Sequence, residues 1–364
     1  MGLFSCGISM FLLSVAIATG IIFTFKSESF RLFGSDGVPG ILDLFKSHKH
    51  DVNIGDSATN YESKFDKHHE AAGDKDTSMV NDYYNIATDF FEYGWGKSFH
   101  FAHTKTDESH DDSISRHERR IVDVLGIKET DHVLDVGSGI GGPALEIARY
   151  SKAHVTGVTL NAYQIQRSIN DTIKKGLSNK VDFKQMDFTK LEFEANVFDH
   201  AYACEATCHS PTLEMVYKEV FRVLKPGGIF LTYEWLSTKA YNPKSEEHKN
   251  ILWKIAKGDG LPPIRTLDDA LNAARAVGFE VVSEQDLAQD TNGTRPWYYR
   301  LDISGWQYLL THYTCVVTEF LGMAPKGTTH VHGVLLEAVD GLVKGGKANI
   351  FTPMHMIVLR KPKV

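Results

Sequence analysis

The chain has 364 residues, of which 23% are charged and 42% hydrophobic, the ordinary balance of a globular protein with one large or two small domains. Asp and Glu number 46 against 39 Lys and Arg, which gives a net charge of −7. This balance argues against a nucleic-acid backbone as the main partner, because counterion release requires a basic surface. Four irregularly spaced cysteines do not make a disulfide framework, so a reducing compartment is expected.

The first 25 residues carry no charged side chain and no histidine, and Ser9 to Phe25 is mostly Leu, Ile, Val, Phe and Ala. The apolar run from Ser9 to Phe25 is just long enough to span a bilayer, which takes about 20 apolar residues. A cleaved signal peptide would have a basic region before the apolar run; here Lys26 and Arg31 follow it instead. The pattern predicts a membrane anchor at 1–25 with the remainder in the cytosol. The alternatives are a helix lying on the membrane and a buried helix.

Residues 26–79 are predicted to form a linker, because the stretch from Lys46 to Ser78 is polar and poor in large apolar side chains. Its histidines have no companion cysteines at metal-ligand spacing, so we interpret the segment as a solvated tether rather than a metal site.

Beyond Val80, apolar strand-like runs alternate with helix-like runs. Such alternation predicts βαβ units, a parallel sheet and a ligand beyond the carboxyl ends of its strands. Two late strands are separated by a long, aromatic-rich helical insertion. The predicted strands are 131–136, 153–160, 180–186, 198–204, 228–235, 279–285 and 354–359; the helices are 143–150, 164–175 and 211–224, the last with Ser210 and Pro211 as N-cap and first residue.

The loop after the first predicted strand reads VLDVGSGIGG and includes Gly137, Gly139 and Gly141. Glycines let the backbone approach a ligand closely at a helix N-terminus, which suits either a dinucleotide or S-adenosylmethionine. A dinucleotide site needs an acid about 20 residues further on, for the ribose. The second predicted strand ends in Val-Thr-Leu-Asn at 158–161, without a carboxylate. A dehydrogenase is therefore the weakest interpretation.

Three further features favour the methyl donor. Asp187 and Phe188 follow the third predicted strand, where the acid can accept from the adenine amino group and the ring can pack on the base. Phe198-Asp199 opens the fourth strand, and Leu-Lys-Pro-Gly-Gly at 224–228 leads into the fifth. In this order and spacing the pieces resemble the class I S-adenosylmethionine-dependent methyltransferases. The resemblance implies a Rossmann-like, seven-stranded α/β sheet with a helical insertion before the last strand, here preceded by the N-terminal hydrophobic helix.

Five islands narrow the resemblance: FEYGWGKSFHFA at 91–102, EATCH at 205–209, YEW at 233–235, PWYYRL at 296–301 and GGKANIFTPM at 345–354. Together they closely resemble the sterol 24-C-methyltransferases over residues 80–362. The resemblance implies a methyltransferase domain at 80–285 and a sterol methyltransferase C-terminal region at 286–364. It also implies metal-independent methylation of a sterol side-chain alkene at endoplasmic reticulum membranes. The ending of the PWYYRL island is closer to the 24-methylenesterol branch, whereas Tyr93 is typical of the other branch, so first and second methylation both stay open.

By the same resemblance, Asp135 and the glycine loop are expected to hold the methionine end of S-adenosylmethionine. Similarity to related lipid methyltransferases places Thr159, Leu160 and Gln164 at the ribose. Tyr83, Ser98 and His100 are expected to close over the methionine from the N-terminal side.

Methyl addition to an alkene leaves a tertiary carbocation, which aromatic faces stabilise. Phe91, Tyr93 and Trp95 are suited to this role, and Tyr233 and Trp235 are further candidates for substrate contact; the alternative is that they are core aromatics. The cation must then lose a proton to a base. The candidates are His209, Glu205, Glu92 and Glu234, with the alternative that Glu205 and His209 only hydrogen-bond one another or the cofactor.

The sequence is also compatible with two other functions. One is methylation of another lipid or amine, such as a phosphobase or a tocopherol precursor, which would share the core and the glycine loop. The other, of a different class, is a membrane-tethered binding protein with a catalytically dead methyltransferase fold. The sequence leaves the oligomeric state open, a homo-oligomer included.

Overall fold

A computed structural model describes residues 61, 65, 78–289, 292–303, 305–322, 324 and 326–363. The predicted anchor at 1–25 and nearly all of the predicted linker lie outside these residues. Among the described helices, none has the length and apolarity needed to cross a bilayer.

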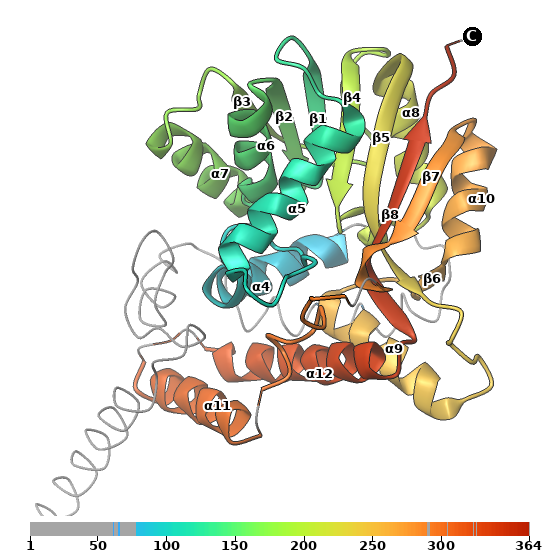
Figure 1. Cartoon of the computed structure of the whole chain (residues 1–364). Coiled ribbons are helices and arrows are strands. Elements are labelled where there is room, and N and C mark those ends of the chain that lie inside the picture. Colours follow the sequence, from blue (N-terminus) through green and yellow to red (C-terminus); the bar gives the residue numbers. More distant parts are fainter. Residues whose placement is uncertain are drawn as a thin grey trace, which may run out of the picture. The chain divides into compact units, whose positions relative to one another are not determined.

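The described strands form one sheet in the order β3-β2-β1-β4-β5-β8-β7, and the short β6 pairs with the end of β5 (Figure 1). The first five strands run parallel, whereas β8 lies antiparallel between β5 and β7. The predicted α/β fold with a mainly parallel sheet is confirmed. The strands are β1 His132–Val136, β2 His154–Thr159, β3 Val181–Gln185, β4 Phe198–Cys204, β5 Leu224–Ser237, β6 Arg265–Thr266, β7 Glu280–Asp286 and β8 Phe351–Arg360.

Two hydrophobic clusters cover the two faces of the sheet. One joins the sheet to α5 (His110–Leu125) and α6 (Gly142–Ser151) through residues such as Ile121 and Leu145. The other joins it to α8 (Leu213–Val223) and α10 (Leu267–Val277), through residues such as Val216 and Ala273. Strands between two helical layers are buried on both faces, which explains their nearly continuous apolar runs. Helix α7 (Ala162–Lys174) packs against β2 and β3.

The predicted start of the helix after β4 is wrong. Helix α8 begins at Leu213, with Thr212 at its N-cap position. The Ser210 hydroxyl donates to the Thr212 carbonyl, 2.6 Å away, instead of capping a helix. A short 3-10 turn, η1 (Thr207–His209), fills the space between β4 and this start. A second such turn, η2 (Leu287–Gln289), follows β7.

A further group of helices lies beyond the ends to which the parallel strands point (Figure 1). Helix α4 (Ser78–Trp95) runs next to the sheet, and α9 (Glu246–Asp259), α11 (Gly305–Phe320) and α12 (Thr328–Lys347) form a layer below it. The predicted helical insertion is thus α11 and α12, which precede β8. Because β8 inserts between β5 and β7, the C-terminal residues are part of the same hydrophobic core as α5 and α6.

Helices α9 and α12 pack in close contact at Gly258. A Cβ at this position would lie 2.3 Å from the Ala338 Cβ and 2.6 Å from its Cα, a separation that real atoms do not adopt. Gly258 therefore sets the distance at which the C-terminal helices pack against α9.

We predict that Gly258→Ala destabilises the protein by about 1–3 kcal/mol, because overpacking outweighs the gain in helix propensity. Gly333→Ala in α12 is the matched control, since nothing lies within 4 Å of its Cβ position; it should be neutral or stabilise by up to about 1 kcal/mol. Denaturant midpoints measure both. Equal midpoints for the two variants would contradict the close α9–α12 contact.

Candidate functional site

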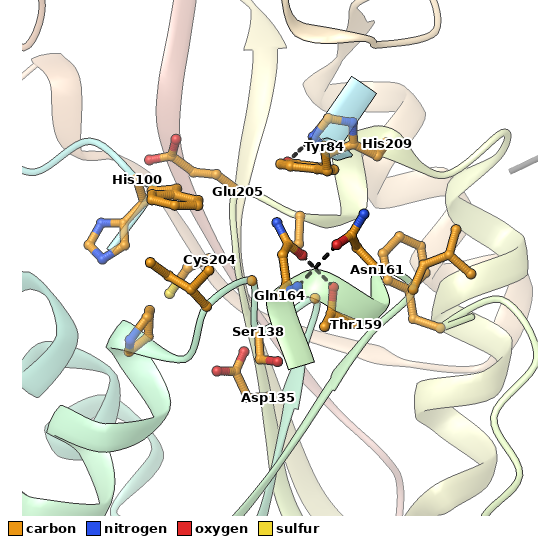
Figure 2. Close-up of a pocket in the computed structure, with 18 of the residues that line it drawn as sticks. Tyr84, His100, Asp135, Ser138, Thr159, Asn161, Gln164, Cys204, Glu205 and His209 are labelled. Atoms are coloured by element: carbon orange, nitrogen blue, oxygen red, sulfur yellow. Dashed lines mark hydrogen bonds between the residues drawn. The ribbon is translucent and has the colours of Figure 1, made fainter. Parts of the chain in front are cut away.

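A pocket opens at the carboxyl ends of β1, β2 and β4, where the parallel-sheet argument places the ligand. Its walls come from the glycine loop, the starts of α6 and α7, the segment after β4, and helix α4 (Figure 2). In the view of Figure 2, Tyr84 and His209 lie at the top of the pocket and Asp135 and Ser138 at the bottom.

The glycine loop leaves no room for a side chain at Gly137 or Gly141. Gly137 has φ 82°, and a Cβ there would lie 2.3 Å from the Ala206 Cβ. Gly139 also lines the pocket. Gly141 is the N-cap of α6 and is not among the lining residues; a Cβ at Gly141 would meet the Phe183 ring at 2.6 Å. Its role in this structure is to let β3 pack against the start of α6.

Asp135 and Ser138 carry buried oxygen atoms without a hydrogen-bond partner, namely Asp135 Oδ2 and Ser138 Oγ. Both residues line the pocket. Burial raises the pKa of Asp135 to about 7, and the nearby Tyr202 hydroxyl opposes this shift only in part. A buried acceptor left without a partner is costly. This end of the pocket therefore suits a ligand that brings a positively charged donor, such as the ammonium group of a methionine moiety.

The end of β2 supplies a second polar group of lining residues. The Thr159 hydroxyl donates to Gln164 Oε1 at 2.7 Å, and both residues line the pocket together with Leu160. Asn161 was not predicted. Its side chain accepts from the Gln164 backbone N–H as the N-cap of α7, and it donates to Asn85 Oδ1 of α4 at 2.7 Å. Its position between a strand and a helix, where N-caps occur, was the available signal.

Phe188 lines the pocket beside Gly137. Its neighbour Asp187 is not among the lining residues. The Asp187 Oδ1 atom accepts from the Thr189 backbone N–H at 2.8 Å and from its hydroxyl at 2.7 Å. The predicted pair is thus divided into a ring at the wall and a carboxylate that stabilises the following turn.

Of the two adjacent tyrosines on α4, Tyr84 faces the pocket and Tyr83 does not. Tyr83 shares its helix face with Met79 and Ala87, at four-residue spacing, and all three belong to the buried core. Tyr84 instead lines the pocket with Val80 and Asn81. Tyr83 was predicted in error, because the sequence did not indicate which face of this helix is directed toward the pocket.

His100 lines the pocket and is bound on its buried side by Glu118 of α5. His100 Nε2 lies 3.3 Å from Glu118 Oε1, which also accepts from the Ser98 hydroxyl at 2.6 Å. Burial lowers the pKa of His100, but Glu118, with smaller contributions from Glu205 and the Phe101 carbonyl, outweighs this effect, so the net pKa is raised. Ser98 is not among the lining residues. Glu118, which was not predicted, thus links both of them to α5.

His209, in η1, lines the pocket beside Tyr84. Its Nε2 atom lies 2.8 Å from the Tyr84 hydroxyl, and its Nδ1 atom lies 3.3 Å from the Gly260 carbonyl oxygen. Burial lowers the pKa of His209 to about 4. The ring is therefore neutral at physiological pH.

Glu205, at the end of β4, lines the pocket with a backbone φ of 54°, which is uncommon for a residue other than glycine. Its Oε1 accepts from the Phe101 N–H and its Oε2 from the Trp235 Nε1–H, each at 2.8 Å. Burial raises the pKa of Glu205 to about 8. Glu205 and His209 do not hydrogen-bond each other; each has other partners.

The two remaining predicted acids are buried outside the pocket lining. Glu92 forms an ion pair with Arg167 and lies 3.8 Å from Lys97 Nζ. Glu234 accepts from Thr207 and, at 2.8 Å, from the Tyr217 hydroxyl. Both carboxylates thus tie neighbouring elements together.

Most of the predicted aromatic residues support the pocket from behind. Trp95 donates to the His100 carbonyl at 2.7 Å, and the Phe91 ring packs on Phe99, which itself lines the pocket. Tyr233 is fully buried, with its ring centroid 4.1 Å from that of His117. Trp235 contacts the site through Glu205. The side chain of Tyr93 lies outside the described part of the structure.

Within the described residues, no three His, Cys, Asp or Glu side chains are grouped closely enough to hold a metal ion.

Comparisons with known proteins match both halves of the chain. A methyltransferase domain matches residues 134–232, and a sterol methyltransferase C-terminal region matches residues 299–363. The chain is 43% identical over 311 residues to 24-methylenesterol C-methyltransferase 3 of Arabidopsis thaliana, covering 85% of this chain and 86% of that protein. It is 46% identical over 316 residues to cycloartenol-C-24-methyltransferase 1 of Oryza sativa subsp. japonica, covering 82% and 91%.

Among solved structures, a mycolic acid cyclopropane synthase in complex with SAH and CTAB superposes with a TM-score of 0.63 at 15% identity. The match covers 78% of this chain and 98% of that one. At this identity the likeness shows the fold alone.

The sheet order with its antiparallel β8, together with a glycine-lined pocket after β1, defines a class I S-adenosylmethionine-dependent methyltransferase. The chain is more than 40% identical to the two plant sterol methyltransferases along more than four fifths of its length. This chain belongs to the sterol methyltransferase family, as the sequence islands predicted.

Proposed function

We propose that the protein transfers a methyl group from S-adenosylmethionine to the side-chain alkene of a sterol, either at C-24 of a Δ24 sterol or at a 24-methylene carbon. The observation that carries the proposal is the pocket itself. One end presents the unpartnered oxygens of Asp135 and Ser138, and the other end presents the Tyr84–His209 pair. The names of the relatives supply the sterol.

The residues of the pocket fit the donor. Asp135, Ser138 and the glycine loop would hold its methionine end. Thr159, Leu160 and Gln164 would contact its ribose. Phe188 would pack against the adenine, and Asp187 would hold the turn that follows Phe188 and remains the candidate acceptor for the adenine amino group. When bound, S-adenosylmethionine supplies an electrophilic methyl group on a positively charged sulfur. His100 would close the methionine side, held in place by Glu118 and Ser98.

The chain accelerates the transfer by alignment and by exclusion of water. The rings of Tyr84 and Phe99 line the pocket, where their faces can stabilise the positive charge that forms on the sterol side chain. Phe91, whose ring packs on Phe99, supports this wall from behind. Trp95 and Trp235 support the neighbouring lining residues His100 and Glu205 through their indole N–H groups. Tyr93 and Tyr233 stay candidates for contact with the substrate. His209 and Glu205 are the proton-accepting candidates that line the pocket.

We also infer that the protein works at the endoplasmic reticulum membrane through an N-terminal anchor at residues 1–25. A sterol resides in a bilayer, whereas the methyl donor is charged and water-soluble. The uncharged run before Lys26 supports a tether that keeps a cytosolic catalytic domain beside its lipid substrate.

The binding of S-adenosylmethionine should depend on pH through Asp135. A cationic ligand selects the ionised carboxylate, and the pKa of Asp135 in the free protein is raised to about 7. Affinity should therefore fall about fivefold between pH 7 and pH 6, as the carboxylate takes up a proton. Asp135→Asn should weaken binding roughly ten- to a hundredfold and remove this pH dependence. Titration calorimetry measures both; an unchanged pH dependence in the variant would exclude Asp135.

Enzyme incubated with labelled donor should methylate a Δ24 sterol or a 24-methylene sterol, and product masses show which. Phosphoethanolamine serves as the comparison substrate in parallel. Methylation of the amine with neither sterol modified would overturn the proposed substrate. Absence of donor binding by calorimetry would instead favour a catalytically dead binding protein.

Deletion of residues 1–25 should move the protein from the membrane pellet to the supernatant after fractionation, with donor binding unchanged. Replacing the same residues with an unrelated membrane anchor should restore the pellet. If the truncated protein stays in the pellet, the catalytic domain itself holds the membrane and the anchor proposal fails.

A further inference from the structure

The hydrogen bonds of His209 fix which of its ring nitrogens carries the proton. The Gly260 carbonyl oxygen, 3.3 Å from Nδ1, can only accept a hydrogen bond. Nδ1 must therefore be the donor, and in a neutral ring Nε2 is left as an acceptor. The Tyr84 hydroxyl, 2.8 Å from Nε2, is consequently the donor to the imidazole. The two rings also meet edge to face, with centroids 5.3 Å apart.

These hydrogen bonds determine whether the Tyr84 oxygen or His209 Nε2 can accept a proton from the substrate. The single lone pair of the imidazole is occupied by the Tyr84 proton. The Tyr84 oxygen has donated its only proton and keeps its lone pairs, in a residue that lines the pocket. A proton leaving a substrate in the pocket would therefore reach Tyr84 before it reached His209.

We propose that Tyr84 is a catalytic residue, which takes the proton from the methylated sterol cation while passing its own proton to His209 Nε2. This inference rests on the proposed function. Tyr84 lies outside the sequence islands, and His209 is then the acceptor of the Tyr84 proton rather than the group in contact with the substrate.

Methyl transfer and proton loss together conserve atoms and electrons. The alkene electron pair forms the new bond to the methyl carbon as the bond from that carbon to sulfur breaks and its electron pair stays on sulfur. A C–H bond next to the cationic carbon then breaks, and its electron pair becomes the new double bond. The proton goes to the Tyr84 oxygen, the Tyr84 proton goes to His209, and the imidazolium later releases a proton to solvent.

The surroundings favour a coupled transfer over a free phenolate. Burial raises the pKa of Tyr84, and the neighbouring Cys208, Asp259 and Glu205 add to this shift. Tyr84 therefore stays protonated at rest and must lose one proton as it gains another. Glu205 is the rival base, but its two oxygens are held by Phe101 and Trp235, and burial raises its pKa to about 8, so it is largely protonated at neutral pH.

The decisive variants are Tyr84→Phe, His209→Gln and the double variant, with Tyr241→Phe as the control. Tyr241 also packs against a histidine, with its ring 6.2 Å from that of His248, but it does not line the pocket. Turnover and product masses are measured with the sterol that the wild type accepts. Calorimetry with S-adenosylmethionine shows that each variant is folded and still binds the donor.

We expect Tyr84→Phe to bind the donor within about threefold of wild type and to lose at least about a hundredfold in turnover, the usual contribution of a positioned acid or base. Methylated sterol alcohols, formed when water captures the cation, should appear among its products. The double variant should be no slower than the slower single variant, because the two residues act as one unit. Tyr241→Phe should retain wild-type turnover and products.

Three results would overturn the proposal. The first is wild-type turnover and products in Tyr84→Phe, and the second is a loss of turnover in the double variant equal to the product of the two single losses. The third is methylated sterol alcohols from Glu205→Gln while Tyr84→Phe yields none. Nitrogen NMR of histidine-labelled wild-type enzyme gives a test without substitution of Tyr84. His209, assigned by comparison with His209→Gln, should be neutral at pH 7 with its proton on Nδ1; a proton on Nε2 would reverse the relay and exclude it. A wild type that binds the donor but methylates no sterol would contradict the proposed function, not the proton transfer.

Discussion

The buried carboxylate of Glu205 holds together three parts of the chain on which the site depends. Glu205 follows β4 with its backbone in a left-handed conformation. Its carboxyl group accepts hydrogen bonds from the backbone N–H of Phe101 and from the indole N–H of Trp235 in β5. Loss of either donor would leave a buried carboxyl oxygen without a hydrogen-bond partner, which costs about 1–3 kcal/mol. The aromatic island at 91–102 is thereby fixed against the sheet. The same anchoring positions α4, whose last turn overlaps the island, as one wall of the pocket.

The ionisable groups around the pocket are held close to neutrality. Burial raises the pKa values of Asp135, Glu205 and Asp259, each to about 7 or 8, and lowers that of His209 to about 4. His100 is an exception, because Glu118 stabilises its protonated form. A site with carboxyl groups near their titration point can ionise them when a cationic ligand enters, at small cost. This is the electrostatic character that a positively charged methyl donor and a carbocation require.

The fold was largely predictable, because alternation of short apolar runs with amphipathic runs carries a strong signal when strands are buried on both faces. The bounds predicted for β4 coincide with those observed, and the glycine loop was placed correctly after β1. The start of α8 was misplaced, because a Ser-Pro pair also fits a turn, and here the Ser210 hydroxyl bonds the Thr212 carbonyl. The site was predicted less well. Glu92 and Glu234 have suitable chemistry and lie in the right islands, yet both are satisfied by partners outside the pocket lining.

The sequence by itself determined the class of fold, the position of the donor site and the family, because glycine spacing, strand periodicity and motif order are local properties. Only the tertiary structure decided between neighbouring residues. Tyr83 and Tyr84 are chemically identical and adjacent, but the rotation of about 100° between consecutive helical residues sends the first into the core with Met79 and the second into the pocket beside His209. The phase of α4 is set by its packing against distant segments. Information of that kind is absent from a local pattern and present only in the folded chain.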